Sequence, residues 1–307
     1  MFFDSDNDWA QRAARVVAEL PARFAQDGLT VDNHGLVALR EEGGGRLSGY
    51  AYRGDWRCYP CSLVKSFHLV HALGALEQGA LTPHPELERA LRDMILWSSN
   101  TATNYVIDLL TGTTGDTLLE EEALARWIAA REGLNRWFDR LGWPEMAGCN
   151  LTQKLMDDIR YGREAQFAAT QGGYLNQLTP CATARLMAAI FGAALPLSPA
   201  AHLRAQALLA RDPRDPEAAN PNFQLSEYLG GHLPAGVRIW SKAGHNLWTG
   251  DPKASWFKHD MIRLEAPGQK PVIFVLMTQG ERLASTVPDA FPRIGRHLFD
   301  ALCGESA

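Results

Sequence analysis

The sequence lacks the features of several large classes of protein. No Lys/Arg-rich run occurs in its 307 residues and the formal net charge is −5, so we expect no nucleic acid as a partner. No uninterrupted apolar run reaches the length of a membrane span, so we expect no membrane partner either. The first residues are acidic and no apolar stretch follows them. No export signal is therefore visible, and we expect a cytoplasmic protein.

Cysteine is scarce. The chain has five cysteines, and an odd number in a large chain favours reduced thiols over a disulfide framework. Cys58 and Cys61 have the spacing of a zinc or redox motif, but no second cysteine pair or close histidine pair accompanies them. We therefore expect no metal and no cofactor. What is abundant is apolar sequence, at 46% hydrophobic residues against 21% charged, which predicts a globular protein with a large core.

Predicted strands lie near both ends of the chain. Two short apolar or alternating runs, 34–40 and 48–53, flank a glycine-rich turn, which is typical of a β-hairpin. The last quarter contains three more predicted strands, at 236–244, 254–264 and 271–278. Strands at both ends with helices between them indicate one sheet assembled from both termini, with a helical domain inserted.

Helical periodicity covers most of the remaining sequence. Between these helices, the polar and glycine-containing stretch 150–176 predicts a long ordered loop. The predicted helices span 8–25, 61–76, 134–141, 181–194, 203–211 and 288–302.

One predicted helix begins with two residues that could act together in catalysis. Ser62 and Lys65 follow Pro60 at the start of an apolar helix, and residues three apart share a helix face. A lysine can activate a serine hydroxyl if burial or a second positive charge lowers the lysine pKa. The motif alone is weak, because a surface helix with a solvated lysine would look the same.

Two later stretches add polar groups. Ser98-Ser99-Asn100 separates an apolar helix from a new helix capped by Asn100 or Thr101, and ordinary capping would explain it alone. Lys242-Ala243-Gly244 lies in a predicted strand after the helical region. Trp97 directly precedes the first of these motifs and Trp240 lies two residues before the second, which indicates either an aromatic pocket wall or core tryptophans at a domain junction.

The three motifs in this order resemble the penicillin-recognising serine hydrolases, and most closely the class A β-lactamase-like family, whose set is S-x-x-K, S-D-N and K-T-G. The resemblance implies an α+β fold of three αβα layers, with an antiparallel sheet built from both chain ends. It also implies a sheet domain of residues 1–66 and 200–307, an all-α domain of residues 67–199, and an active site at their interface.

The resemblance also implies roles for individual residues. Ser62 would attack a carbonyl, Lys65 would receive its proton, and Ser98 would pass a proton to the leaving group. Asn100 would bind the substrate and hold Lys65.

The third motif would complete the site. Lys242 would attract a substrate carboxylate and keep Lys65 deprotonated, and Gly244 belongs to the same substrate-binding strand. The backbone N–H groups of Ser62 and His245 would form the oxyanion hole.

The sequence departs from the family pattern at three points. Ser99 replaces the aspartate of S-D-N, and Ala243 replaces the hydroxyl residue of K-T-G. The glutamate that activates the deacylating water is not clearly present. Glu164 is the candidate, and the alternative is a solvated loop acid.

Together these features predict a serine hydrolase that forms an acyl-enzyme at Ser62 and cleaves an amide or ester bond, a lactam included, of a small molecule. One alternative is a sensor or binding domain that is acylated but turns over slowly or not at all. Another is a class A β-lactamase proper.

Overall fold

The computed structural model describes residues 1–113, 117–155, 160–171 and 175–304. Its centre is an antiparallel six-stranded sheet with the strand order β2-β1-β6-β5-β4-β3. The sheet is assembled from both ends of the chain, as predicted. Its strands are β1 (His34–Gly43), β2 (Arg46–Tyr52), β3 (Ala210–Arg211), β4 (Arg238–His245), β5 (Phe257–Glu265) and β6 (Val272–Gln279).

Strand β3 differs from the prediction, which placed its two residues at the end of a helix. The observed helix α9 (Pro199–Leu209) ends earlier, and Ala210 and Arg211 pair with Trp240 and Ile239 of β4. Two residues are too few to show a strand period, so only the tertiary pairing reveals this strand. β5 pairs along one edge of β4, whereas along the other edge only the two residues of β3 pair with it within the described part of the chain.

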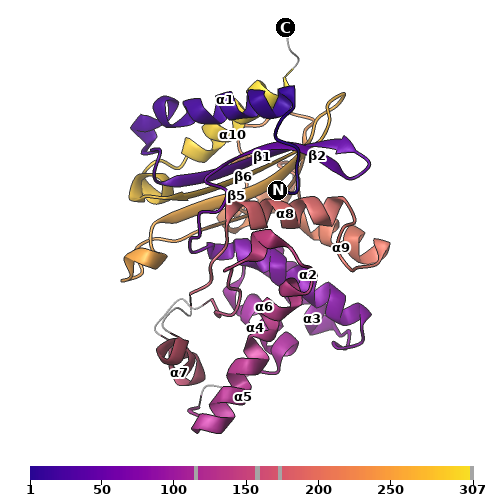
Figure 1. The fold of residues 1–307 in the computed structure, drawn as a ribbon, viewed down its shortest axis with the longest axis vertical. Helices are drawn as coiled ribbons and strands as arrows, with labels where there is room; N and C mark the ends of the chain where they lie inside the picture. Colours follow the sequence, from indigo (N-terminus) through magenta and orange to yellow (C-terminus); the bar gives the residue numbers. More distant parts are fainter. Residues whose placement is uncertain (114–116, 156–159, 172–174, 305–307) are drawn as a thin grey trace.

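The sheet is covered on both faces, because its central strands are apolar on both faces. In β6, Phe274 and Leu276 point into one core, whereas Ile273 and Val275 point into the other. Helices α1 (Asp8–Arg23) and α10 (Ala290–Cys303) cover the first face, and α8 (Pro180–Phe191) lies on the second (Figure 1). This arrangement confirms the three-layer αβα fold.

The other helices form a region on the α8 side of the sheet (Figure 1). Helix α2 packs at its centre and is buried on nearly every side, so it is a rigid support for the residues at its start. The division of the chain into 1–66 with 200–307 and 67–199 stays a prediction. The helices of this region are α2 (Val64–Glu77), α3 (Pro85–Leu96), α4 (Asn100–Thr111), α5 (Glu121–Arg131), α6 (Gly133–Asp139), α7 (Gly162–Gln171) and α9.

Helix α7 lies inside the stretch predicted to be a loop. Phe167 of α7 packs against Leu124 and Trp127 of α5 in a small separate cluster, and the two rings meet edge to face. A helix of this length is marginal alone, so the prediction failed because tertiary packing stabilises it. Among the residues that the structure describes, no helix has both the length and the apolar character of a membrane span.

Candidate active site

Ser62 lies in a strained turn that leads into α2. A single 3₁₀ turn (Cys61–Leu63) precedes the helix, and Cys61 has a φ of +48°. A non-glycine residue in this left-handed region costs about 1–3 kcal/mol, and such strain is concentrated at functional sites. The turn packs against β4, where a Cβ on Gly244 would lie only 2.4 Å from the backbone nitrogen of Ser62. Glycine at position 244 therefore allows the strand to approach the serine.

A buried histidine fastens the segment before Ser62 to the sheet. His259 of β5 accepts a hydrogen bond from the Thr278 N–H through Nδ1 (3.1 Å), so its Nε2–H donates to the carbonyl oxygen of Tyr59 (2.8 Å). Burial lowers the pKa of His259 to about 4, which keeps the ring neutral. No sequence pattern indicated this anchor, because its partners are distant in the chain.

The Lys65 ammonium contacts the turn between α3 and α4. The side chain is fully buried, and Nζ donates to Asn100 Oδ1 (2.9 Å), to Ser98 Oγ (3.3 Å) and to the Ser98 carbonyl oxygen. Ser98 itself has a φ of +54°, a second left-handed non-glycine residue at this site. The structure thus brings Lys65, Ser98 and Asn100 together.

The cap of α4 differs from the expected one. The Ser99 hydroxyl accepts a hydrogen bond from the Ala102 N–H (3.1 Å), so Ser99 is the N-cap and not Asn100 or Thr101. The amide oxygen of Asn100 is turned instead toward Lys65. Ser99, which replaces the aspartate of S-D-N, therefore has a structural role as the N-cap of α4.

Lys242 reaches the same turn from β4. Its Nζ donates to Ser98 Oγ (2.9 Å), to Gln224 Oε1 (2.6 Å) and to the carbonyl oxygen of Ala243 (2.6 Å). No carboxylate lies within 4 Å of this ammonium among the described residues. Burial lowers the pKa of Lys242 well below its ordinary value, and the charges of Lys65 and Arg211 lower it further.

A serine hydroxyl between two lysines is the central feature of this geometry. Ser98 Oγ lies 3.3 Å from Lys65 Nζ and 2.9 Å from Lys242 Nζ. A hydroxyl oxygen has two lone pairs, so Ser98 Oγ accepts one hydrogen bond from each amine and connects the two lysines. The three groups come from α2, the α3–α4 turn and β4, and a proton can pass between the two amines through the Ser98 hydroxyl.

Comparison with known proteins identifies the family of this chain. A family model described as the beta-lactamase enzyme family matches residues 68–302, well over half of the chain. The chain belongs to the β-lactamase enzyme family. Membership makes it an enzyme of the serine hydrolase type, as predicted. The matched region begins after Ser62 and Lys65. The roles assigned to these two residues therefore rest on their S-x-x-K motif and on their place at the start of α2.

Several solved structures share the fold. The β-lactamase from Sphaerobacter thermophilus DSM 20745 is 19% identical with a TM-score of 0.63, covering 96% of this chain and 98% of its own. The last common ancestor of Gram-negative bacteria class A β-lactamase (GNCA4) is 21% identical with a TM-score of 0.59, covering 95% and 99%. PBP-A is 18% identical with a TM-score of 0.60, covering 93% and 96%. A search of curated proteins found no match.

Glu164 is not the solvated loop acid of the alternative interpretation. In this β-lactamase-family chain the carboxylate is buried, not solvated, and its oxygens lie 2.7 and 3.2 Å from the guanidinium nitrogens of Arg131. Arg131 is fully buried and also contacts Thr113 and the carbonyl oxygen of Thr152. Arg131 occupies both oxygens of this carboxylate, so this geometry does not favour Glu164 as the activator of water.

His245 ends β4 beside Gly244. The residue is exposed as a whole, but its ring is partly buried, and Nδ1 lies 2.8 Å from the hydroxyl of Tyr228. Burial of part of the ring lowers the pKa of His245, and the nearby Lys258 charge lowers it further. Sequence reasoning missed Gln224 and Tyr228, since nothing in the sequence around them is distinctive. The oxyanion role of the Ser62 and His245 N–H groups stays a prediction.

The pair Cys58 and Cys61 lies directly before Ser62. Both thiols are buried, and burial raises the pKa of each above its ordinary value. Raised thiol pKa values oppose the thiolate form that binds metals and attacks disulfides. In the described ranges, no group of three or more His, Cys, Asp or Glu side chains is arranged to hold a metal ion.

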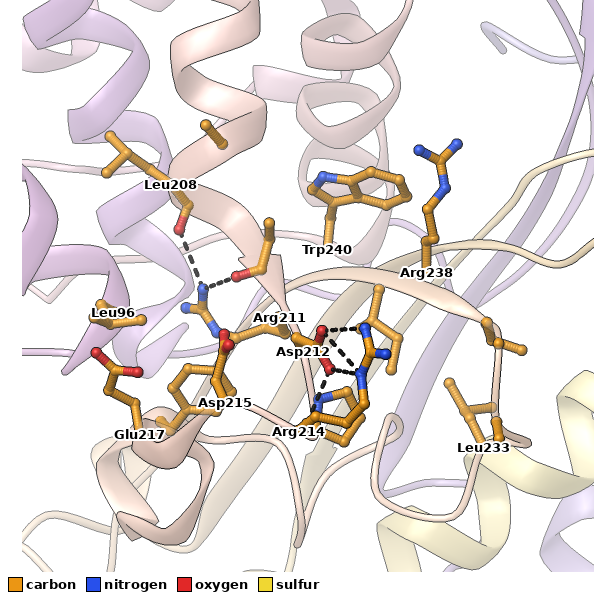
Figure 2. A pocket seen from close by; sticks show the side chains of 18 of the residues that line it. Leu96, Leu208, Arg211, Asp212, Arg214, Asp215, Glu217, Leu233, Arg238 and Trp240 are labelled. Atoms are coloured by element: carbon orange, nitrogen blue, oxygen red, sulfur yellow. Dashed lines mark hydrogen bonds and ion pairs between the residues drawn. The ribbon is translucent and has the colours of Figure 1, made fainter.

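A cavity of about 900 Å³ lies at the opposite end of β4 (Figure 2). Trp240, Leu208 and Leu233 line it together with Arg211, which donates to the carbonyl oxygens of Leu208 and Ile95. None of the predicted site residues is among its described lining. Trp240 therefore faces this cavity, which is separate from the lysine cluster.

Proposed function

We propose that the chain hydrolyses an amide or ester bond of a small molecule, lactams included, through an acyl-enzyme at Ser62. The observation that carries the proposal is the Ser98 hydroxyl within hydrogen-bond distance of both Lys65 and Lys242. Strain at Cys61 and Ser98 supports it, because Cys61 directly precedes the proposed nucleophile Ser62 and Ser98 is the proposed proton donor.

Acylation would take place at Ser62 in the following way. Lys65 accepts the proton of Ser62 while the serine oxygen bonds to the carbonyl carbon. The carbonyl oxygen becomes an oxyanion, which the N–H groups of Ser62 and His245 would stabilise; a single such donor contributes about 3–4 kcal/mol in comparable enzymes. When the bond to the leaving group breaks, Ser98 donates its proton to that group, and the proton held by Lys65 replaces it.

Lys242 supports this sequence electrostatically. Its contact with Ser98 Oγ orients that hydroxyl, and a positive charge here would stabilise an anionic group of the substrate. The amide oxygen of Asn100 holds Lys65 in place, which leaves the Asn100 amide N–H₂ group for the substrate.

A sensor that keeps its acyl group is the second candidate function. It is favoured by one observation: Arg131 occupies both carboxylate oxygens of Glu164, the acid expected to activate the deacylating water. Loss of the water base would slow deacylation and leave acylation intact.

A mass measurement separates these functions. The protein and its Ser62→Ala variant are each mixed with a chromogenic ester and with a β-lactam, and intact mass and absorbance are followed over time. Turnover that Ser62→Ala abolishes supports the hydrolase. A lasting adduct without turnover supports the sensor, and full activity in Ser62→Ala would overturn both.

A further inference from the structure

A cavity of about 900 Å³ lies beside the first residues of β4, and apolar side chains form much of its wall. Leu96, Leu208 and Trp240 are among them (Figure 2). The cavity is open at this place because β3 pairs only with Ile239 and Trp240, and the chain then leaves the sheet before Pro213, which has no N–H for a ladder bond. Sites that hold small molecules in proteins have volumes of about 300–1,000 Å³, so the cavity is large enough for one.

Charged side chains also line this cavity. Among the described residues of the lining are four arginines, and three of them form ion pairs with carboxylates. These pairs are Arg92 with Glu217, Arg214 with Asp212, and Arg238 with Glu265. Arg211 is the fourth, and no carboxylate of the described residues lies within 4 Å of its guanidinium. The lining therefore contains a buried positive charge without a partner of opposite sign.

The ends of two helices hold part of the Arg211 guanidinium. Nη1 donates to the carbonyl oxygens of Leu208 (3.1 Å) and Ala210 (2.9 Å), and Nη2 donates to that of Ile95 (2.9 Å). A guanidinium has five N–H groups, so these three hydrogen bonds leave two, and Nε has no partner in the described part of the chain. Arg211 is only 5% exposed, and a buried donor without an acceptor destabilises the protein. An acceptor in the cavity would remove this destabilisation.

The chemistry of these groups defines the class of ligand. A guanidinium stays charged, and its planar set of N–H groups fits the two oxygens of a carboxylate. Asp215 and Glu217 also line the cavity, and their negative charges oppose a ligand with two charges, such as a phosphate monoester. Leu96 and Trp240 offer contacts to an apolar or aromatic group. Together these residues favour a monocarboxylate that carries one apolar group.

We propose that this cavity is a second binding site, which takes a small monocarboxylate with an apolar body and holds its carboxylate at Arg211. The site is separate from the proposed reaction, because none of the predicted site residues is among its described lining. Binding there does not require acylation of Ser62, so the tests below stand whether or not the proposed function holds.

The first test compares two probes that share an aromatic body, cinnamate and the neutral cinnamyl alcohol. Neither probe contains an ester or amide bond. Isothermal titration calorimetry should show saturable binding of cinnamate that is at least about tenfold tighter than binding of the alcohol, as expected for hydrogen bonds to a charged group. Equal affinity for the two probes, or no saturable binding, overturns the proposal.

The position of the probe is read from the tryptophan side chains by NMR. The chain has nine tryptophans, and the indole N–H signals of Trp240 and Trp137 are assigned by their loss in Trp240→Phe and Trp137→Phe. Cinnamate should shift the Trp240 signal. It should leave the signal of Trp137 unchanged, because that ring stacks on His71 in the helical region. An unchanged Trp240 signal at saturation overturns the site.

Two variants test the assigned contacts. Arg211→Met should lower the affinity for cinnamate to that for the alcohol. Because this change also removes three bonds to backbone carbonyls, Ala207→Phe is the second variant: it fills the cavity from α9 and keeps these bonds. Ala207→Phe should abolish binding of both probes, whereas Ala125→Phe, at an exposed position of α5 outside the described lining, should not. Unchanged binding in Ala207→Phe overturns the proposal.

A last variant tests the lysine cluster as the alternative position for the anion. Lys242 is also a buried cation and lies on the same strand as Trp240. In Lys242→Met the affinity for cinnamate should stay within about twofold, as for independent sites. A loss of binding in Lys242→Met would assign the anion to the lysine cluster and overturn the proposal.

Discussion

Two buried basic clusters in this molecule differ in what surrounds the positive charge. Arg131 in the helical region is fully buried, and a carboxylate, that of Glu164, lies 2.7 Å from its guanidinium. It also stacks on the Trp127 ring at 4.5 Å. Lys242 is equally buried, but its partners are a hydroxyl, an amide oxygen and a backbone carbonyl oxygen.

This difference separates a structural charge from a functional one. A buried ion pair neutralises itself and mainly holds local structure together. The positive charge of a buried ammonium whose partners are neutral oxygens remains available to attract an anionic ligand. Such an ammonium also loses its proton more easily. In the sequence, Arg131 and Lys242 are both basic residues within a regular element. Only the groups that contact them in the folded protein distinguish the two.

The largest expected effect comes from removing the proton acceptor in the lysine cluster. Lys65→Met keeps the length and the apolar stem of the side chain but has no amine. Acylation of Ser62 should fall by about 10²–10⁴-fold, the usual contribution of a general base. Stopped-flow absorbance with a chromogenic ester measures the rate, and retention of more than a tenth of it would contradict the assigned role.

The matching change in the other cluster should affect stability. Arg131→Met leaves the Glu164 carboxylate buried and unpaired, and breaking a buried pair in this way costs about 3–5 kcal/mol. Urea unfolding measures the loss of stability. The acylation rate of the folded fraction should stay within about twofold. Arg296→Met, which removes a surface ion pair with Asp300, is the control and should cost less than about 1 kcal/mol.

The contact between β4 and Ser62 gives an intermediate effect. Gly244→Ala places a Cβ 2.4 Å from the Ser62 nitrogen, so either the strand or the serine must shift. We expect a loss of about 1–3 kcal/mol in stability, as for other overpacked sites, together with a larger loss of acylation. Gly133→Ala is the control, because the nearest atom to its Cβ is the end of a flexible arginine at 3.6 Å. A fully active Gly244→Ala would show that the close approach is not needed.

The smallest expected effect concerns Asp260, the acid near Lys242. Burial raises the pKa of Asp260 to about 7, above its value of 3.8 in the unfolded chain. Between these values the folded protein binds more protons than the unfolded chain, so this carboxyl lowers stability as pH rises from about 4 to 7.

Asp260→Asn should remove this pH-dependent loss. The amide oxygen can still accept the Leu229 N–H, whose bond to the carboxylate is 3.0 Å long. We expect the free energy of unfolding at pH 8, relative to pH 5, to rise by about 1–2 kcal/mol compared with the wild type. Denaturation at the two pH values measures the difference, and an unchanged pH dependence would contradict the assignment.

Much of this architecture could be predicted from the sequence. The strands at both chain ends and the order of the three motifs indicated the three-layer fold, and the structure brings Lys65, Ser98, Asn100 and Lys242 together. These features are local patterns of apolar spacing and residue type, which a single sequence displays directly.

The partners of the charged groups could not be predicted. Arg131 and Glu164 are 33 residues apart, and Gln224 meets Lys242 from a segment without regular structure. The cap at Ser99, the short strand β3 and helix α7 were missed for the same reason. Each of these features depends on which distant segments come into contact after folding, and a local sequence pattern does not show such contacts.

One experiment tests the central claim most directly. The protein is quenched within the first seconds of reaction with an activated ester or a β-lactam, digested, and the acylated peptide is identified by tandem mass spectrometry. The account predicts a single modified residue, Ser62, with the adduct absent in Ser62→Ala and strongly slowed in Lys65→Met. Acylation at any other residue, or equal labelling in Ser62→Ala, would contradict the mechanism.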